Sequence, residues 1–365
     1  MGQARIDRRA ASRTGIRAKA WAGSSQNHVL WVRARLNVIE TPPCWANFLL
    51  VKCSVCHTDL HFARTTDPSI MPPAPMVAGH EGAGFVVAIA PGTQSSVKVG
   101  QAVGVKWLGS SCLSCEACAR GGNESICPSA VQTGFGFDGT FQQYAVSYAA
   151  HVTPIPESVP LHLAAPILCA GLTVYKALKE ADASPGDIVV IPGAGGGLGK
   201  CHLAIQYAIN AFGLRVIAVD TGDHKKELCL RLGAETFIDF KDSVDIIEDV
   251  IRAADGVGAH AAIVTSGLTA VYGQSLQYLR RGGTLVAVGV SGKIEVDMVT
   301  AIPRNIKIKT VFVGNREEAR QALDMLARGR IQTTCRVEPL AKLPEVFNEM
   351  EEGKFAGRIV LDLWN

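Results

Sequence analysis

Two groups of cysteine and histidine residues in this chain have the spacing of metal ligands. In the first group, four cysteines lie between residues 112 and 127, and the first three are three residues apart. Four thiolates are common ligands of a structural zinc ion, and in a reducing compartment such a pattern rarely forms disulfides. The spacing therefore predicts a structural zinc site whose ligands are Cys112, Cys115, Cys118 and Cys127.

The second group begins with the run Cys-His-Thr-Asp-Leu-His at residues 56–61. It continues with His80 beside Glu81 and ends with Cys169. Two thiolates and one imidazole leave a fourth zinc position open for water or substrate, which is typical of a catalytic site. We expect Cys56, His80 and Cys169 to bind this ion, with Glu81 as a neighbouring or transient ligand.

A zinc ion at this second site would act as a Lewis acid and lower the pKa of a bound oxygen to about 7. An alcohol bound there would lose hydride readily, and its hydroxyl proton would need a path to solvent. The hydroxyl of Thr58 can relay that proton, and the imidazole of His61 can pass it outward. Asp59 has the position expected of a carboxylate that orients an imidazole.

A glycine-rich turn at residues 193–199, between a predicted strand and a predicted helix, indicates a dinucleotide site. Glycines let backbone N–H groups approach a pyrophosphate at a helix N-terminus. The turn is one residue longer than the motif G-x-G-x-x-G, so the prediction of a dinucleotide site depends on the flanking strand and helix. The alternative is a glycine-rich turn in some other doubly wound domain. Asp220, at the next predicted strand end, would bind ribose hydroxyls and favour NAD over NADP. The predicted contacts in the turn are Gly193, Gly195, Gly196, Gly197, Leu198 and Gly199.

The predicted helices and strands divide the chain into two parts. A length of 365 residues suggests two domains at roughly 150 residues each. From about residue 49 to 170, short apolar runs separated by glycine and proline predict strands joined by turns. From about residue 172, strands alternate with helix-length segments, which predicts a parallel sheet with helices on both faces. The tail after about residue 314 is expected to return to the first lobe.

Composition excludes several classes of protein. With 48% hydrophobic and 19% charged residues the chain is globular, and a net charge of +3 gives no case for nucleic acid. No uncharged apolar run reaches the roughly 18 residues of a membrane-spanning helix, and no secretory signal opens the chain. We expect a soluble, cytoplasmic protein. Residues 1–39 are Arg-rich and acid-poor, so a mitochondrial transit peptide, a solvated arm or a segment outside the folded unit are alternatives for that segment.

The motifs taken together resemble the yeast-type zinc alcohol dehydrogenases, which are NAD-dependent medium-chain enzymes. The resemblance covers about residues 49–365 and rests on CHTDLH, GHEGAG, KWLGSSCLSCEAC, DGTFQQYA and APILCAGLTVYKALK. It implies an α/β fold with a GroES-like, mostly-β catalytic domain at 49–170, to which 314–365 return. A Rossmann domain, a doubly wound parallel sheet that binds NAD, is implied at 171–313.

The resemblance also implies roles for individual residues. Cys56, His80 and Cys169 resemble the catalytic zinc ligands and Glu81 the alternate ligand, while Thr58 and His61 resemble the proton relay. His57 and Arg358 resemble pyrophosphate contacts, and Asp220 and Lys225 resemble adenosine ribose contacts. The family further implies two zinc ions per chain, a small alcohol or aldehyde as substrate, and a homo-oligomer, usually a tetramer in fungi.

The chain departs from the family pattern at three places. Eight residues separate Cys118 from Cys127 where the family usually has seven, which predicts a bulged turn at Gly121 and Gly122. Trp107 is present, but the second tryptophan that narrows the family's pocket for ethanol is absent. We therefore expect a wider pocket and a substrate larger than ethanol, such as a specialised-metabolite aldehyde.

The third departure is residues 1–48, which do not resemble the family's opening strands and form an atypical segment. Because those strands help to cover the active site in the family, a zinc- and NAD-binding protein of low activity is the remaining alternative. Every residue with a predicted chemical role is present, which favours the enzyme.

Overall fold

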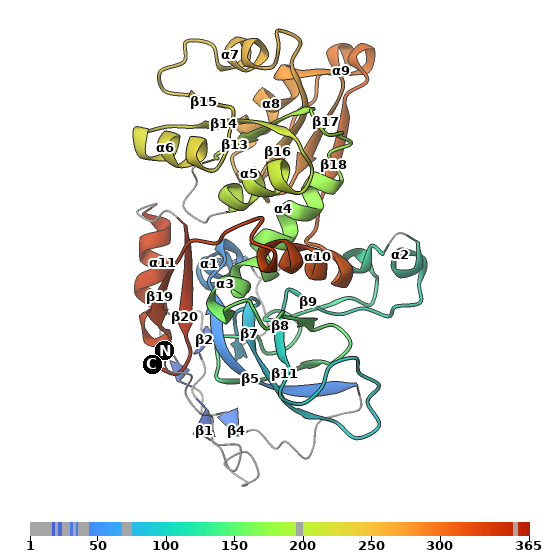
Figure 1. Cartoon of the computed structure of the whole chain (residues 1–365), viewed down its shortest axis with the longest axis vertical. Coiled ribbons are helices and arrows are strands. Elements are labelled where there is room, and N and C mark those ends of the chain that lie inside the picture. The colour runs from blue at the N-terminus through green and yellow to red at the C-terminus, as the bar shows by residue number, and fades with distance from the viewer. Residues whose placement is uncertain are drawn as a thin grey trace.

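The chain forms two lobes, stacked along its longest axis (Figure 1). The computed structural model describes residues 44–67, 75–120, 122–194, 200–352 and 357–365, except for the side chains of residues 200 and 201. It also gives the backbone of four short strands: β1 (Arg17–Ala18), β2 (Trp21–Gly23), β3 (Leu30–Trp31) and β4 (Ala34–Arg35). The remainder of residues 1–43, Gly121 of the predicted bulged turn, and the predicted contacts Gly195, Gly196, Gly197, Leu198 and Gly199 lie outside the described residues.

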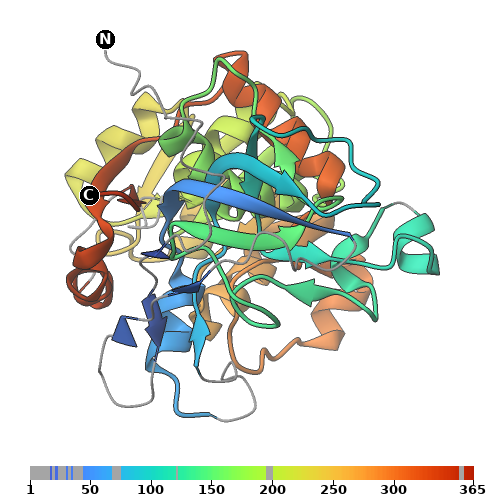
Figure 2. The ribbon, with the colours of Figure 1, turned by 90° about the horizontal axis from the view of Figure 1, so that it is seen from below.

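The first lobe is built on a seven-stranded sheet with the order β12-β8-β7-β5-β20-β19, in which β11 also pairs with β5. Neighbouring strands are antiparallel except β19 and β20, and Figure 2 shows the long β5 strand crossing the lobe. The strands are β5 (Trp45–Ser54), β7 (Gly82–Ile89), β8 (Ala102–Val105), β11 (Tyr144–Tyr148), β12 (Thr153–Pro154), β19 (Cys335–Pro339) and β20 (Arg358–Asp362). The C-terminal strands therefore belong to the sheet of the first lobe.

Shorter elements complete the first lobe. They are α1 (His57–Arg64), β6 (Met76–Val77), β9 (Leu108–Ser110), α2 (Glu116–Ala119), η2 (Glu124–Ile126), β10 (Val131–Gln132), α3 (Leu161–Ala164), η3 (Ala165–Leu168), η4 (Leu340–Lys342) and α11 (Leu343–Glu351). Apolar side chains of β5, β7, β8 and α11 form one buried core. The lobe starts earlier than residue 49, because β5 begins at Trp45 and its first residues are already buried.

The second lobe is a six-stranded parallel sheet with helices on both faces. Its order is β15-β14-β13-β16-β17-β18, so the direction of winding reverses between β13 and β16. The strands are β13 (Ile188–Pro192), β14 (Arg215–Asp220), β15 (Thr236–Asp239), β16 (Ala259–Val264), β17 (Leu279–Ala287) and β18 (Lys307–Thr310). In such sheets ligands bind beyond the carboxyl ends of the strands at this reversal.

Six helices accompany this sheet in the described part of the chain. They are α4 (Ala170–Lys179), α5 (Lys200–Asn210), α6 (Asp223–Arg231), α7 (Ile246–Ala253), α8 (Thr269–Tyr278) and α9 (Met298–Arg304). The following helix, α10 (Arg316–Ala327), packs on α4 and on β12 and η3 of the first lobe. Separate apolar cores lie on the two faces, which is why the strands are buried and almost wholly apolar. Among the described residues no single helix is long and apolar enough to cross a membrane, although Leu161–Leu168 and Ala170–Lys179 pass that test together as a bent pair.

Candidate active site

Cys56, His80, Glu81 and Cys169 converge in the structure. Their ligand atoms all lie within 4.8 Å of one another, and all four residues are buried. Cys56 and Cys169 precede the first residues of α1 and α4, and Gly79, whose φ of +93° favours glycine, turns the chain into His80. The Nε2 atom of His80 is buried with no hydrogen-bond partner among the described residues, as expected of a nitrogen that binds a metal. These four residues therefore fit a zinc ion.

Asp59 orients the imidazole of this group. Its Oδ1 atom lies 3.0 Å from Nδ1 of His80, and its Oδ2 atom accepts the backbone N–H of Cys56 at 2.8 Å. A proton held on Nδ1 leaves the lone pair of Nε2 free for a metal. Burial alone would lower the pKa of His80, but Asp59 and Cys56 together hold that pKa above its ordinary value.

Glu81 lies between the metal group and a buried arginine. The guanidinium of Arg358, 1% exposed, donates to Oε2 of Glu81 and to Oγ of Ser54 at 2.7 Å. Burial raises the pKa of Glu81, and the charge of Arg358 opposes that rise. The other oxygen, Oε1, has no hydrogen-bond partner among the described residues, so it is free to approach a metal ion.

The predicted proton relay lies along α1. Thr58 is half-buried, and its Oγ1 accepts a hydrogen bond from the Sγ of Cys56 at 3.7 Å. His57 and His61 are exposed. Residues three apart share one face of a helix, so Thr58 and His61 span the distance from the buried sulfur to solvent.

Aromatic side chains form a wall beside His80. The ring of Trp107 lies 5.0 Å from the imidazole in a T-shaped contact, and Phe62 stacks on Trp107 at 6.0 Å. Phe135 lies 5.3 Å from Phe62, and Phe312 lies 6.4 Å from Trp107. Of these rings only Trp107 was predicted from the sequence, because nothing local marks a phenylalanine as part of a site.

The four clustered cysteines also converge. Their sulfur atoms are 3.5 to 4.0 Å apart over the four pairs in contact. Sulfurs around a tetrahedral zinc ion, with bonds of about 2.3 Å, lie about 3.8 Å from one another. Gly122, with a φ of +66°, turns the chain before η2, so the eight-residue spacer still returns Cys127 to the group. Backbone N–H groups of Ser114 and Cys115 lower the pKa of Cys112 to about 6, which favours the thiolate.

The predicted cofactor residues lie at the carboxyl ends of β13 and β14. Gly193 follows β13 with a φ of +73°, and its N–H donates to the carbonyl of Val219 at 2.8 Å. Asp220 ends β14, is buried, and accepts a bond from Nζ of Lys225 at 2.6 Å. The carboxylate and the ammonium group thus lie together at the carboxyl end of β14, the strand next to β13.

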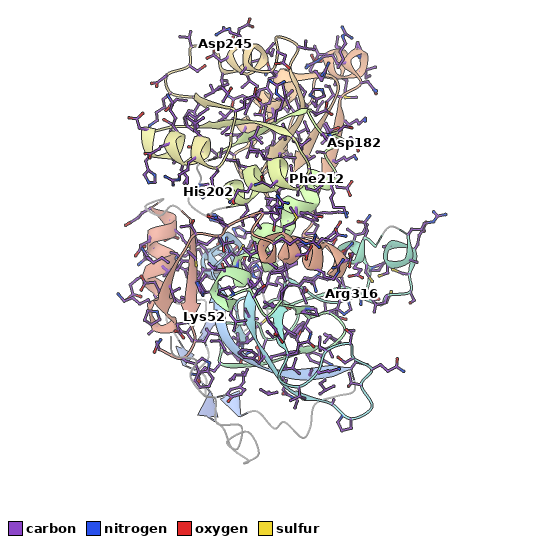
Figure 3. The ribbon with its side chains drawn as sticks, in the orientation of Figure 1. Lys52, Asp182, His202, Phe212, Asp245 and Arg316 are labelled. Carbon is purple, nitrogen blue, oxygen red and sulfur yellow. The ribbon has the colours of Figure 1, made fainter. Side chains whose placement is uncertain are left out.

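His202 on α5 was not identified from the sequence, since a lone histidine in a helix carries no signal. It is 8% exposed, its Nε2 atom has no hydrogen-bond partner among the described residues, and Figure 3 labels it near the junction of the lobes. Burial lowers its pKa to about 4, and the charge of Asp220 only partly opposes this. His202 and Arg358 line one small cavity, which places Arg358 near α5 as well as beside Glu81.

Comparison with known proteins covers both lobes. Residues 49–157 match the family described as an alcohol dehydrogenase GroES-like domain, and residues 197–328 match the family described as a zinc-binding dehydrogenase. An alcohol dehydrogenase of Schizosaccharomyces pombe is 47% identical over 85% of this chain and 87% of its own length. Alcohol dehydrogenase 1 of Emericella nidulans is 45% identical over 89% of this chain and 93% of its own length.

Solved structures show the same fold. An alcohol dehydrogenase from the archaeon Aeropyrum pernix superposes with a TM-score of 0.85 at 26% identity, covering 94% of this chain and 99% of that one. A cinnamyl alcohol dehydrogenase from Sorghum bicolor superposes with a TM-score of 0.80 at 27% identity, covering 95% of this chain and 98% of that one. The predicted α/β fold, with a GroES-like lobe and a doubly wound lobe, is confirmed.

Proposed function

The chain belongs to the zinc-dependent alcohol dehydrogenase family, and we propose that it interconverts a primary alcohol larger than ethanol and its aldehyde with NAD(H). The observation that carries this proposal is the buried group of Cys56, His80 and Cys169 next to an aromatic wall. The thiols and the free Nε2 atom would hold the zinc ion, which when bound supplies Lewis-acid polarisation of the substrate oxygen.

The chain's own residues complete the reaction. Asp59 keeps the imidazole of His80 in the tautomer that leaves Nε2 free. Thr58 accepts the hydroxyl proton of the alcohol and gives up its own proton toward His61, which exchanges it with solvent. The carboxylate of Asp220 would bind the ribose hydroxyls and repel a 2′-phosphate, which supports NAD as the cofactor.

The aromatic wall supports a substrate larger than ethanol. Trp107, Phe62 and Phe135 present apolar ring surface beside His80. The described residues that follow α1, Thr65 to Asp67, contain no tryptophan to narrow the pocket. Burying each additional methylene in such a pocket contributes roughly 1 to 3 kcal/mol to binding in the transition state.

A substrate series tests this proposal. Steady-state kcat/KM for ethanol, 1-butanol and benzyl alcohol, each measured with NAD and with NADP, should rise by roughly tenfold or more from ethanol to the larger alcohols. NAD should be the better cofactor throughout the series. A clear preference for ethanol would contradict the proposed substrate class, and a preference for NADP would contradict the role of Asp220.

The edge of the second lobe supports a homo-oligomer. Strand β18 pairs only with β17 among the described strands, and Ile308 on it is 41% exposed. Ile302 and Val299 of the preceding helix are 68% and 83% exposed. The strand itself reads Lys-Ile-Lys-Thr, so the apolar surface at this edge comes from Ile308 together with Ile302 and Val299. An unpaired strand edge beside exposed apolar side chains is normally covered, and we propose that a second copy of the chain covers it. The molar mass of the wild type, measured by light scattering, should be a multiple of the 38.7 kDa chain mass. The substitution Ile308→Lys should lower this molar mass. A wild-type monomer would contradict the proposed homo-oligomer.

A further inference from the structure

The loop between the third and fourth clustered cysteines contacts the second half of the chain. The carbonyl of Gly122 accepts a hydrogen bond from Nδ2 of Asn315 at 2.7 Å. Glu124 accepts two bonds from Arg316, one from Nε at 2.9 Å and one from the backbone N–H at 3.2 Å. Asn123, between them, accepts a bond from Nζ of Lys176 on α4 at 3.2 Å. Three consecutive residues of this loop thus bind residues at the N-terminus of α10 and on α4.

Glu124 is the central group of this contact. It is 6% exposed, and its carboxylate lies in the field of two cations, Arg316 and the buried Lys106. Burial lowers the pKa of Lys106 to about 7, and Glu124 opposes this while Arg316 adds to it. Lys106 directly precedes Trp107, so the charge of Glu124 acts beside Trp107 as well as on Arg316. Removing its charge would leave two cations without their counter-ion.

A strained segment of four residues, Val311–Gly314, joins β18 to Asn315. The contact with the cysteine loop lies directly after this segment. Val313 has a φ of +47°, a conformation that is rare for a β-branched residue and persists only when its surroundings hold it. A Cβ atom on Gly314 would lie 2.4 Å from Leu172, so the segment also packs closely on α4. Phe312 belongs to this segment, and its ring forms the T-shaped contact with Trp107.

The first turn of α10 contacts α4 as well as the cysteine loop. Asn315 caps the helix, accepting the backbone N–H of Glu318, and Glu318 binds Lys176 and Lys179 of α4 at 3.2 and 3.1 Å. Figure 3 shows Arg316 at the end of α10 nearest the cysteine loop. The segment that carries Phe312 is therefore held by β18 at one end and by the cysteine loop and α4 at the other.

We propose that Glu124 and Arg316 are positioning residues for the alcohol pocket. By holding Arg316, the cysteine loop keeps the Val311–Gly314 segment in its strained conformation and so places Phe312 against Trp107. The cysteine loop then contributes to substrate binding as well as to stability. This role follows from the contacts alone and goes beyond the proposed preference for larger alcohols.

A double-mutant cycle between Glu124→Gln and Phe312→Ala tests the proposal on the zinc-loaded, full-length protein. Each single variant should raise KM for the alcohol roughly threefold or more, with little change in kcat, because a binding surface rather than a reacting group is lost. The KM of the double variant should exceed that of Phe312→Ala by no more than about 1.5-fold, since Glu124 acts through Phe312. Zinc content should equal that of the wild type in all three variants.

Glu317→Gln is the matched control. It makes the same chemical change on α10, next to Arg316, at a residue that is 56% exposed and pairs with Arg320 instead of the cysteine loop. Its KM should equal that of the wild type. If Glu124→Gln loses zinc or fails to fold, Arg316→Gln replaces it in the cycle, because Arg316 lies outside the cysteine loop and is 39% exposed.

Three results would overturn the proposal: an unchanged KM in the Glu124 and Arg316 variants, an unchanged KM in Phe312→Ala, or fully multiplicative effects in the double variant. Ethanol and benzyl alcohol are both used as substrates. A preference of the wild type for ethanol would count against the proposed substrate class, while the cycle would still decide the positioning role.

Discussion

Two buried carboxylates lie next to the metal group and differ in what they can do. Asp59 uses both oxygens, one toward His80 and one toward the backbone of Cys56, so it is committed to orientation. Glu81 uses one oxygen toward Arg358 and keeps Oε1 without a partner among the described residues. The neighbours of each carboxylate therefore separate an orienting role from that of a transient ligand.

Thr58 should be essential for turnover, because its hydroxyl is the only group proposed to accept the substrate proton directly. Replacement by valine keeps the shape and removes the hydroxyl, so kcat should fall by roughly 10²- to 10⁴-fold. Thr58→Ser should retain most of the activity. NADH absorbance at saturating alcohol measures kcat, and zinc content checks that the site is loaded. A loss of less than threefold in the valine variant would remove Thr58 from the relay.

His202 should make the protein sensitive to acid. Its pKa is about 4 in the folded chain and about 6.5 when unfolded, so the unfolded chain binds the extra proton between these values. The stability contributed by the neutral histidine is complete above about pH 6.5 and is lost as pH falls toward 4. At pH 5 the loss from this group is about 2 kcal/mol.

Urea unfolding at pH 7 and pH 5 measures this effect. The free energy of unfolding of His202→Gln should fall by about 2 kcal/mol less than that of the wild type between the two pH values. Both proteins carry the same zinc ligands, so acid release of zinc affects them alike. Equal losses in both proteins would show that His202 does not titrate as its burial indicates.

Helix N-termini supply both thiols of the metal group. Cys56 and Cys169 immediately precede α1 and α4, where the unpaired N–H groups and the helix dipole favour negative charge. The two helices thus position both sulfur ligands at sites whose backbone dipoles favour the charge of a metal-bound thiolate.

Close strand pairing in the first lobe makes Gly84 of β7 irreplaceable. A Cβ atom there would lie 2.0 Å from the carbonyl oxygen of Leu49 on β5, and backbone cannot move aside cheaply. Gly84→Ala should destabilise the protein by roughly 3 kcal/mol. Thermal unfolding measures the change, with Gly273→Ala in α8 as the control.

A Cβ atom on Gly273 would meet no atom within 4 Å, and alanine is favoured over glycine in a helix by up to about 1 kcal/mol. The melting temperature should therefore drop for Gly84→Ala and stay level or rise for Gly273→Ala. Similar shifts in the two variants would contradict the close approach of β5 and β7.

At the scale of the whole molecule, motifs with local spacing predicted most of the site. The family and the fold class were predicted correctly, and the structure brings together each of the two ligand groups named from the sequence. Asp59 was also predictable as an orienting group, because it lies within one helical turn of Cys56. In each case the ligand spacing or the order of the motifs along the chain carried the information.

Contacts between distant parts of the chain could not be predicted. Arg358 meets Glu81 across 277 residues only because β20 joins the sheet beside β5. Phe312 meets Trp107 only because the segment before α10 returns to the first lobe. Such pairs depend on topology, and no residue in either segment signals its partner. The start of β5 at Trp45 is likewise determined by pairing with β7 and β11.

Cys56 belongs, in our proposal, to a catalytic zinc site distinct from the four-cysteine site. Zinc content and NADH formation, measured on the same samples of the wild type and Cys56→Ala, decide this point. We expect two zinc ions per chain in the wild type, and one zinc ion with no detectable alcohol oxidation in the variant. A variant that keeps both zinc ions and its turnover would show that Cys56 is not a ligand of a catalytic zinc ion.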